Sequence, residues 1–195
     1  MRQAEIERIT RETKIRLSLN LDGQGTYANS TGIGFLDHML DGFARQTPYD
    51  LTVKAVGDLH VDQHHTVEDT GIVLGTALKE ALGDSRGIRR YGYFILPMDD
   101  ALILCSLDLC GRSYLAFDVP MPTQKVGDFD TELVQEFFLG LTRAAGMTLH
   151  IKRISGVNSH HIIEAVFKAF GRALAMATSL DQDHLNEIPS TKGVL

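Results

Sequence analysis

The chain has 195 residues, of which 44% are hydrophobic, so it can bury a substantial core as one domain or as two fused units. Its formal net charge of −6 argues against a general nucleic-acid binder, which needs a basic surface to displace counterions from phosphates. The first ten residues lack the apolar stretch of a signal peptide, and no apolar run approaches the length of a membrane span. We therefore expect a soluble cytoplasmic protein without nucleic-acid or membrane partners.

The first half of the chain alternates between strand and helix periodicities. In chain order, the predicted elements are strands at 15–21 and 25–29, a helix at 33–45, a strand at 51–55 and a helix at 64–82. Asp22-Gly23 ends the first strand, and Gly83 ends the second helix. This half therefore predicts a small sheet with two helices.

The second half repeats this order. Its predicted elements are strands at 90–96, 101–109 and 114–119, a helix at 131–145, a strand at 149–151 and a helix at 160–178. Pro120, Pro122 and Gly127 interrupt the pattern before the first of these helices. Cys105 and Cys110 are expected on opposite faces of a strand, which disfavours a disulfide between them.

The repeated order predicts an α+β fold with two pseudo-equivalent halves, each strand-strand-helix-strand-helix, with helices covering one face of each sheet. The halves span about 1–88 and 89–195. No low-complexity linker separates them. We therefore expect a single domain, 1–195, with one shared core.

A metal-ligand motif occurs twice, at the start of a predicted helix in each half, as His64-His65-Thr66-Val67-Glu68 and His160-His161-Ile162-Ile163-Glu164. On a helix, either histidine of a motif can share a face with the glutamate, whereas the two histidines diverge by about 100°. Neighbouring imidazoles at that angle do not easily bind one ion, so two motifs predict two metal sites. The helix dipole keeps imidazoles neutral at this position and therefore available as ligands.

One such motif alone would usually be a solvated or capping feature, but two copies at equivalent places favour metal binding. His38, in the preceding helix, is a further candidate ligand. His60 and His150 are expected in the core or behind the ligands, and His184 in solvent. Imidazole and carboxylate donors without cysteine leave Mn, Fe, Zn, Co and Ni open.

Several longer stretches together resemble the imidazoleglycerol-phosphate dehydratase family over essentially the whole chain. They are Gly34-Phe35-Leu36-Asp37-His38-Met39-Leu40, Asp62-Gln63-His64-His65-Thr66-Val67-Glu68-Asp69, Cys110-Gly111-Arg112, Asn158-Ser159-His160-His161-Ile162-Ile163-Glu164-Ala165 with Phe167-Lys168-Ala169, and Pro189-Ser190-Thr191-Lys192-Gly193. The resemblance implies a fold like that of ribosomal protein S5 domain 2. It also implies a lyase of histidine biosynthesis that converts imidazole glycerol phosphate to imidazole acetol phosphate with two Mn(II) per subunit. Members assemble as cages of 24 identical subunits, with metal sites at subunit contacts.

The resemblance also implies roles for individual residues. The metal ligands would be His38, His64, His65, Glu68, Glu136, His160, His161 and Glu164. Glu136 departs from members that have histidine there, and this change alters the charge of the site. The substrate contacts would be Glu12, His38, Arg90, Arg112, Lys168, Ser190 and Lys192, the cationic ones gripping phosphate.

The reaction needs ions and an acid–base group. Ions bound to the ring nitrogens would stabilise the electrons that expel the hydroxyl from the carbon next to the ring. Glu12, on the first predicted strand, is the expected group that moves the protons, and Glu68 or Glu164 released from a metal is the competing assignment.

Two other classes remain open from the residues alone. A dinuclear metallohydrolase acting on a small phosphorylated substrate would also cluster His and Glu around two ions. A non-catalytic protein would use the clusters as structural metal sites between subunits, without a phosphate pocket. The cations that match the family argue against this second class.

Overall fold

The computed structural model describes residues 2–195. The first half contains β1 (Gln3–Ile9), β2 (Thr13–Asn20), β3 (Tyr27–Ser30), α1 (Gly34–Arg45), β4 (Asp50–Gly57) and α2 (His64–Leu82). The second half contains β5 (Tyr91–Met98), β6 (Ala101–Asp108), β7 (Tyr114–Asp118), β8 (Lys125–Val126), β9 (Phe129–Asp130), α3 (Leu133–Ala145), β10 (Thr148–Ser155) and α4 (Ser159–Thr178). Helix α2 has the predicted boundaries, and the other predicted helices and strands lie within a few residues of theirs.

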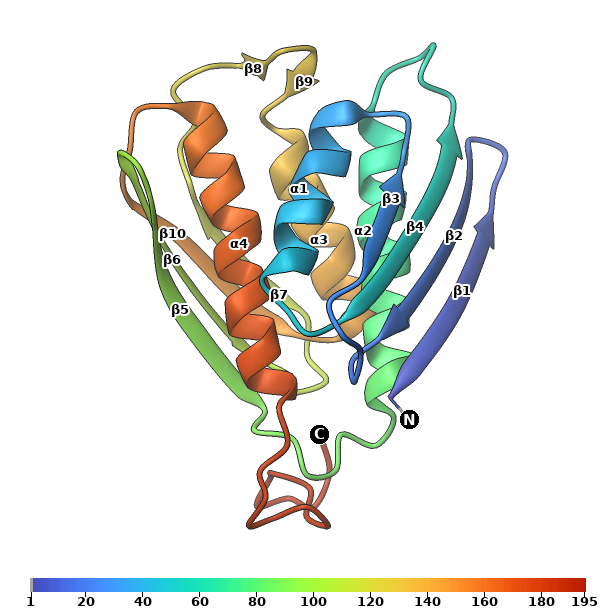
Figure 1. Ribbon diagram of the computed structural model, residues 1–195, viewed down its shortest axis with the longest axis vertical. Coiled ribbons are helices and arrows are strands. Elements are labelled where there is room, and N and C mark those ends of the chain that lie inside the picture. The colour runs from blue at the N-terminus through green and yellow to red at the C-terminus, as the bar shows by residue number, and fades with distance from the viewer. Residues whose placement is uncertain (1) are drawn as a thin grey trace.

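The two halves form sheets of the same topology, with strand orders β1-β2-β4-β3 and β5-β6-β10-β7. In each sheet the last-named pair is parallel and the other two pairs are antiparallel. The four helices lie between the sheets, so that each sheet has helices on its inner face only (Figure 1). The buried apolar side chains of both halves form one core cluster. The predicted α+β fold with two equivalent halves is therefore confirmed.

The first half has one strand more than predicted, β1, whereas the second half adds the β8–β9 hairpin. Strand β1 pairs with β2 along its whole length, from Gln3 opposite Asn20 to Ile9 opposite Lys14. As an edge strand it buries only Ala4 fully and leaves Ile9 64% exposed. Its hydrophobic pattern was therefore too weak to predict a strand from the sequence.

The prediction that Glu12 lies on a strand is wrong. This glutamate lies in the turn between β1 and β2, where the Thr10 hydroxyl accepts hydrogen bonds from the backbone N–H groups of Glu12 and Thr13. A threonine that bonds the backbone in this way stabilises a turn over a continuing strand. The turn leaves the Glu12 side chain exposed.

The helices pack in two parallel pairs, and each pair joins the two halves. A Cβ atom added to Gly71 of α2 would lie 2.2 Å from the Phe137 carbonyl oxygen of α3, and one added to Gly75 would lie 2.4 Å from the Leu141 carbonyl oxygen. In the other pair, a Cβ on Gly171 of α4 would lie 2.8 Å from the Phe43 carbonyl oxygen of α1. Glycine is required because the backbones themselves are in contact.

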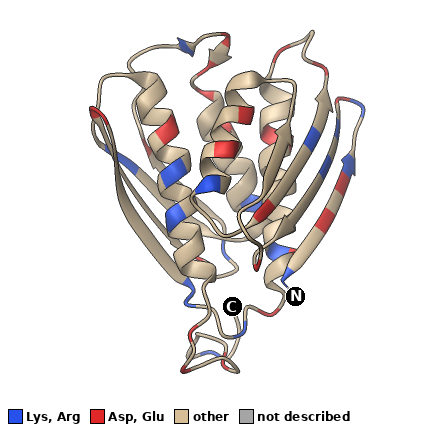
Figure 2. Ribbon diagram, viewed as in Figure 1, with Lys and Arg blue, Asp and Glu red and all other residues tan. Residues whose placement is uncertain are grey.

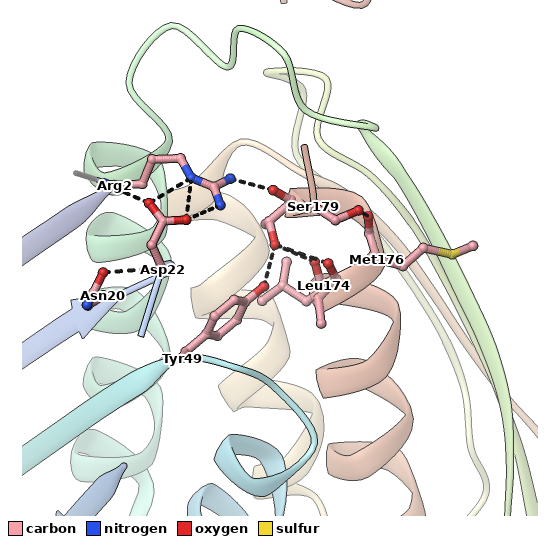
Figure 3. Close-up of polar contacts among 9 residues, drawn as sticks. Arg2, Asn20, Asp22, Tyr49, Leu174, Met176 and Ser179 are labelled. Atoms are coloured by element: carbon pink, nitrogen blue, oxygen red, sulfur yellow. Dashed lines mark hydrogen bonds and ion pairs between the residues drawn. The ribbon is translucent and has the colours of Figure 1, made fainter. Parts of the chain in front are cut away.

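A polar cluster joins the halves at the C-terminal end of α4 (Figure 3). Arg2 forms an ion pair with Asp22 and donates to the Thr178 carbonyl oxygen. The hydroxyl groups of Tyr49 and Thr178 are 2.6 Å apart, and burial raises the pKa of Tyr49 well above its usual value. The buried phenol is thus a neutral hydrogen-bonding group that ties β4 to α4.

Between residues 2 and 195, no helix is both long enough and apolar enough to cross a membrane.

Replacement of Gly71 by alanine should destabilise the protein by about 1–3 kcal/mol, because the added methyl group must push α2 away from the α3 backbone. Chemical denaturation would measure the loss. Gly34→Ala is the matched control, since a Cβ on Gly34 meets no atom within 4 Å. Equal stability of the two variants would contradict the close helix contact.

Candidate metal centre and cationic pocket

Three predicted ligands from opposite halves of the chain converge in one cluster. His38 comes from α1, and His160 and Glu164 come from the first turns of α4; their ligand atoms all lie within 4.8 Å of one another. The Oε2 atom of Glu164 is 3.3 Å from His160 Nε2 and 3.8 Å from His38 Nε2. The close contact between α1 and α4 produces this convergence.

Lys168 occupies the other side of the same carboxylate. Its ammonium nitrogen is 2.6 Å from Glu164 Oε1. Although burial raises the pKa of Glu164, the hydrogen bond and charge of Lys168, together with the charges of His38 and His160, outweigh it and hold this pKa below its usual value. Glu164 is thus an ionised carboxylate with one oxygen facing the two imidazoles.

The two histidines of each motif contact different partners. His160 lies beside Glu164 and His64 beside Glu68, whereas His161 contacts Asp100 and His65 contacts Asp58. The ring centroids are 6.2 Å apart in both pairs. His161 and His65 therefore do not join a cluster with the histidine that precedes them.

His161 is oriented by the tight turn between β5 and β6. Its Nδ1 atom lies 2.7 Å from Asp100, and its Nε2 atom lies 3.5 Å from Asp99. Asp100 also accepts hydrogen bonds from the Val157 and Asn158 backbone N–H groups, which lowers its pKa well below the usual value. The hydrogen bond to ionised Asp100 in turn raises the pKa of His161.

His65 has the same arrangement in the first half. Its Nδ1 atom lies 3.0 Å from Asp58, and this contact raises the pKa of His65. Its Nε2 atom lies 3.9 Å from Glu12, at the tip of the β1–β2 turn. A carboxylate on Nδ1 fixes the tautomer that presents Nε2 to a metal. The sequence analysis did not find Asp58, Asp99 or Asp100, because their partners lie far away in the chain or on another element.

The side chains of the first motif and Glu136 do not form a cluster as compact as that of His38, His160 and Glu164. His64 Nε2 lies 3.8 Å from Glu68 Oε2. A Cβ on Gly140 of α3 would lie 2.9 Å from the Glu68 carbonyl oxygen, so Glu136, one turn earlier on α3, lies at the level of this motif. Among residues 2–195, however, only the His38, His160 and Glu164 cluster meets the geometry of a three-ligand site. The assignment of Glu136 as a ligand stays a prediction.

Four of the predicted substrate contacts line one cationic pocket of about 410 Å³. They are Arg90, Arg112, Ser190 and Lys192. The Arg90 side chain is nearly buried; it pairs with Asp108 at 2.7 Å, which raises its pKa, and it donates to the Pro189 carbonyl oxygen. Arg90 also has a positive φ of 71°, a strained conformation that functional sites often contain. The 189–193 segment is thus held beside the arginines.

The pocket and the metal cluster lie at opposite ends of α4. The backbone N–H of Arg90 bonds to Ala177 in the last turn of this helix, whereas His160 is in its first turn. The helical rise places the two sites about 25 Å apart. In Figure 1 one end of α4 lies towards β8 and β9, and its other end lies towards the C-terminus. Lys168 contacts Glu164 and therefore lies beside the metal cluster, not beside the pocket.

A second cavity of about 510 Å³ lies beside His38 and is lined partly by the β8–β9 hairpin, which was not predicted. Phe129 of this hairpin packs on Phe35, with ring centroids 5.1 Å apart. Gln63 also lines the cavity, and its Oε1 atom is buried without a hydrogen-bond partner.

Two histidines differ from expectation: His60 and His150 are both exposed, because they lie in a turn and on an outward strand position.

Comparisons with known proteins agree with this geometry. Residues 31–174 match the family model described as imidazoleglycerol-phosphate dehydratase. The chain belongs to the imidazoleglycerol-phosphate dehydratase family. Imidazoleglycerol-phosphate dehydratases from Jannaschia sp. (strain CCS1) and Roseobacter denitrificans are 58% and 60% identical to it over 195 residues, which cover all of each chain.

Solved structures show the same fold. Imidazoleglycerol-phosphate dehydratase from Staphylococcus aureus has a TM-score of 0.84 at 41% identity, covering 92% of this chain and 99% of its own. The Pyrococcus furiosus enzyme, solved in complex with (S)-C348, also has a TM-score of 0.84 at 40% identity and covers 97% and 100%. The dehydratase family model spans both motifs, and the relatives align over all 195 residues.

Replacement of Asp100 by asparagine should weaken divalent-metal binding about tenfold near pH 8, because His161 loses the carboxylate that fixes its tautomer. The raised pKa of wild-type His161 means that protons displace metal as the pH falls through that pKa. The variant lowers this pKa, so its disadvantage should shrink towards acidic pH. Equilibrium dialysis against Mn(II) would measure both effects.

Asp181→Asn is the matched control, because Asp181 pairs with His184 Nδ1 at 3.2 Å away from both motifs. It should leave metal binding unchanged. If the two variants bind metal alike, Asp100 has no role in presenting His161.

Proposed function

We propose that this chain dehydrates imidazole glycerol phosphate to imidazole acetol phosphate, a step of histidine biosynthesis, at a centre of two divalent ions. The convergence of His38, His160 and Glu164 from opposite halves is the observation that carries this proposal. The family to which the chain belongs supports the reaction. The cationic pocket supports a phosphorylated substrate.

The donor chemistry fits the two Mn(II) ions per subunit that we propose. Neutral imidazoles and an ionised carboxylate suit a borderline to hard divalent ion with coordination positions left for substrate. His38, His160 and Glu164 would hold one ion, and His64, Glu68 and Glu136 would contribute to the other. When bound, the ions supply Lewis acidity to the imidazole ring of the substrate.

The complete site requires more than one copy of the chain. The metal cluster and the phosphate-binding pocket lie about 25 Å apart along α4. Imidazole glycerol phosphate, with one ring and three carbons, is far too short to reach both. His65 and His161 also lie outside the three-ligand cluster of their own chain. We therefore propose that a neighbouring copy supplies the phosphate pocket and that these two histidines complete metal sites between copies.

The surface suits such an assembly. The first sheet carries charges along its strands, whereas the second sheet is largely uncharged (Figure 2). Tyr93, Ile95 and Ile154 of the second sheet are 65%, 51% and 50% exposed. Exposed apolar side chains gathered on one face favour protein contacts. We propose a homo-oligomer, and 24 subunits is the number we expect.

The side chains of this chain have separate tasks in the reaction. Arg112, Lys192 and the Ser190 hydroxyl would bind the phosphate and hold the substrate in register. Glu12 would take the proton from the carbon next to the one that loses hydroxide, and the resulting enol would tautomerise to the ketone. Its exposed position at the tip of a turn, 3.9 Å from His65 Nε2, suits a group that reaches substrate bound at that histidine. Glu68 and Glu164 would remain ligands.

Dehydration of imidazole glycerol phosphate by metal-stripped protein tests the proposal directly. Activity should be absent from the stripped protein and return with Mn(II), as followed by formation of the ketone product. Full activity without any divalent ion would contradict the metal centre. Loaded protein that does not consume the substrate would contradict the function.

Mixed assemblies test both the role of Glu12 and the sharing of sites between copies. Glu12→Gln and Arg112→Ala should each abolish turnover, the first without loss of bound metal. Co-expressed in equal amounts, they should recover about a quarter of wild-type activity, because random pairing unites an intact Glu12 with an intact Arg112 at that fraction of sites. No recovery would show that one chain supplies both residues.

A further inference from the structure

The two predicted metal centres are related by the internal repeat, and the helix contacts show which residues correspond. A Cβ on Gly42 of α1 would lie 3.9 Å from the Lys168 side chain of α4, and one on Gly140 of α3 would lie 3.1 Å from Ile72 of α2. Gly42 therefore corresponds to Gly140, and Lys168 corresponds to Ile72. One turn earlier on the first helix of each pair, His38 corresponds to Glu136.

These correspondences reveal a difference in charge. The first centre contains one carboxylate, Glu164, which is paired with the Lys168 ammonium at 2.6 Å, so the two charges cancel. The proposed second centre would contain two carboxylates, Glu68 and Glu136. Among residues 2–195, neither of them forms an ion pair with a lysine or arginine, and Ile72 brings no charge where Lys168 brings one. The second centre is therefore more negative by two charges.

Neighbouring charges do not remove this difference. Asp69 follows Glu68 directly, but Arg8 pairs with it at 3.0 Å and the Thr13 hydroxyl donates to it. Asp37, next to His38, accepts hydrogen bonds from the backbone and hydroxyl of Thr31 and makes no ion pair within the described chain. Lys168 remains the cation that directly contacts a ligand carboxylate.

We propose that this chain binds its two divalent ions with unequal affinity: the centre with Glu68 and Glu136 fills first, and Lys168 weakens the centre with His38, His160 and Glu164. This inference rests on the proposed two-ion function. A dication is attracted to two unpaired carboxylates, whereas at the first centre it must share Glu164 with an ammonium group of like sign. At limiting metal, each subunit holds one ion.

The charge difference should separate the two binding steps by about tenfold or more in free metal concentration, since these charges belong to or directly contact the groups that would hold the ions. Equilibrium dialysis of the metal-free full chain against Mn(II) would count bound ions per subunit. Wild-type protein should reach a plateau at one ion before it binds the second. Light scattering on the same samples would record the assembly state at each step.

Substitutions at corresponding positions assign the steps. Lys168→Met should tighten the second binding step, at the centre with Glu164, about tenfold and leave the first binding step unchanged. Glu136→His should weaken the first binding step, at the centre with Glu68. Ile72→Lys should also weaken the first binding step. It places beside Glu68 a cation that corresponds to Lys168 beside Glu164. Lys79→Met is the control, since it removes the same charge from the exposed last turn of α2 and should change neither step.

The outcomes distinguish this inference from the proposed function. Two ions bound over the same concentration range by wild-type protein, or an unchanged gap in Lys168→Met, would overturn the inference while leaving the two-ion centre intact. Absence of bound ions would instead overturn the proposed function. If Ile72→Lys fails to fold, Lys168→Met and Glu136→His still decide the question, because both change side chains that are only partly buried.

Discussion

The close contact between helices of opposite halves is the constraint on which the rest of this structure depends. Glycines at the crossings let the backbone of α4 touch α1 and that of α2 touch α3. His38 is brought against His160 and Glu164 only because its helix comes this near. A larger residue at a crossing would separate the ligands as well as the halves, so the same contacts stabilise the fold and form the site.

The geometry of an α-helix supports the proposal that one chain holds only part of the site. Adjacent histidines on a helix diverge, so His160 joins the cluster with His38 and Glu164 while His161 contacts Asp100 instead. Asp58 and Asp100 orient the second histidine of each motif through its Nδ1 atom. With the cationic pocket at the far end of α4, both features favour a site shared between copies of the chain.

The two halves of the chain resemble each other more closely in backbone arrangement than in the charges of their side chains. Sheet order, strand direction and helix crossings agree between the halves, yet Glu136 stands opposite His38 and Ile72 opposite Lys168. Backbone contacts tolerate few substitutions because any added atom meets another backbone. Side chains at the open ends of the helices tolerate charge changes, so two centres of common descent can differ in their preference for metal.

The sequence by itself determined the helices, most strands, the repeat and the ligand motifs, because periodicity and spacing along one element are local properties. It did not reveal β1, whose apolar positions are half exposed, or the turn that carries Glu12. Only the tertiary structure decided that His38 joins the second motif and not the first, that Asp58 and Asp100 hold the second histidine of each motif, and that the cationic pocket lies far from the metal cluster. These relations depend on which helices pack together, and that choice is made by contacts between residues far apart in the chain.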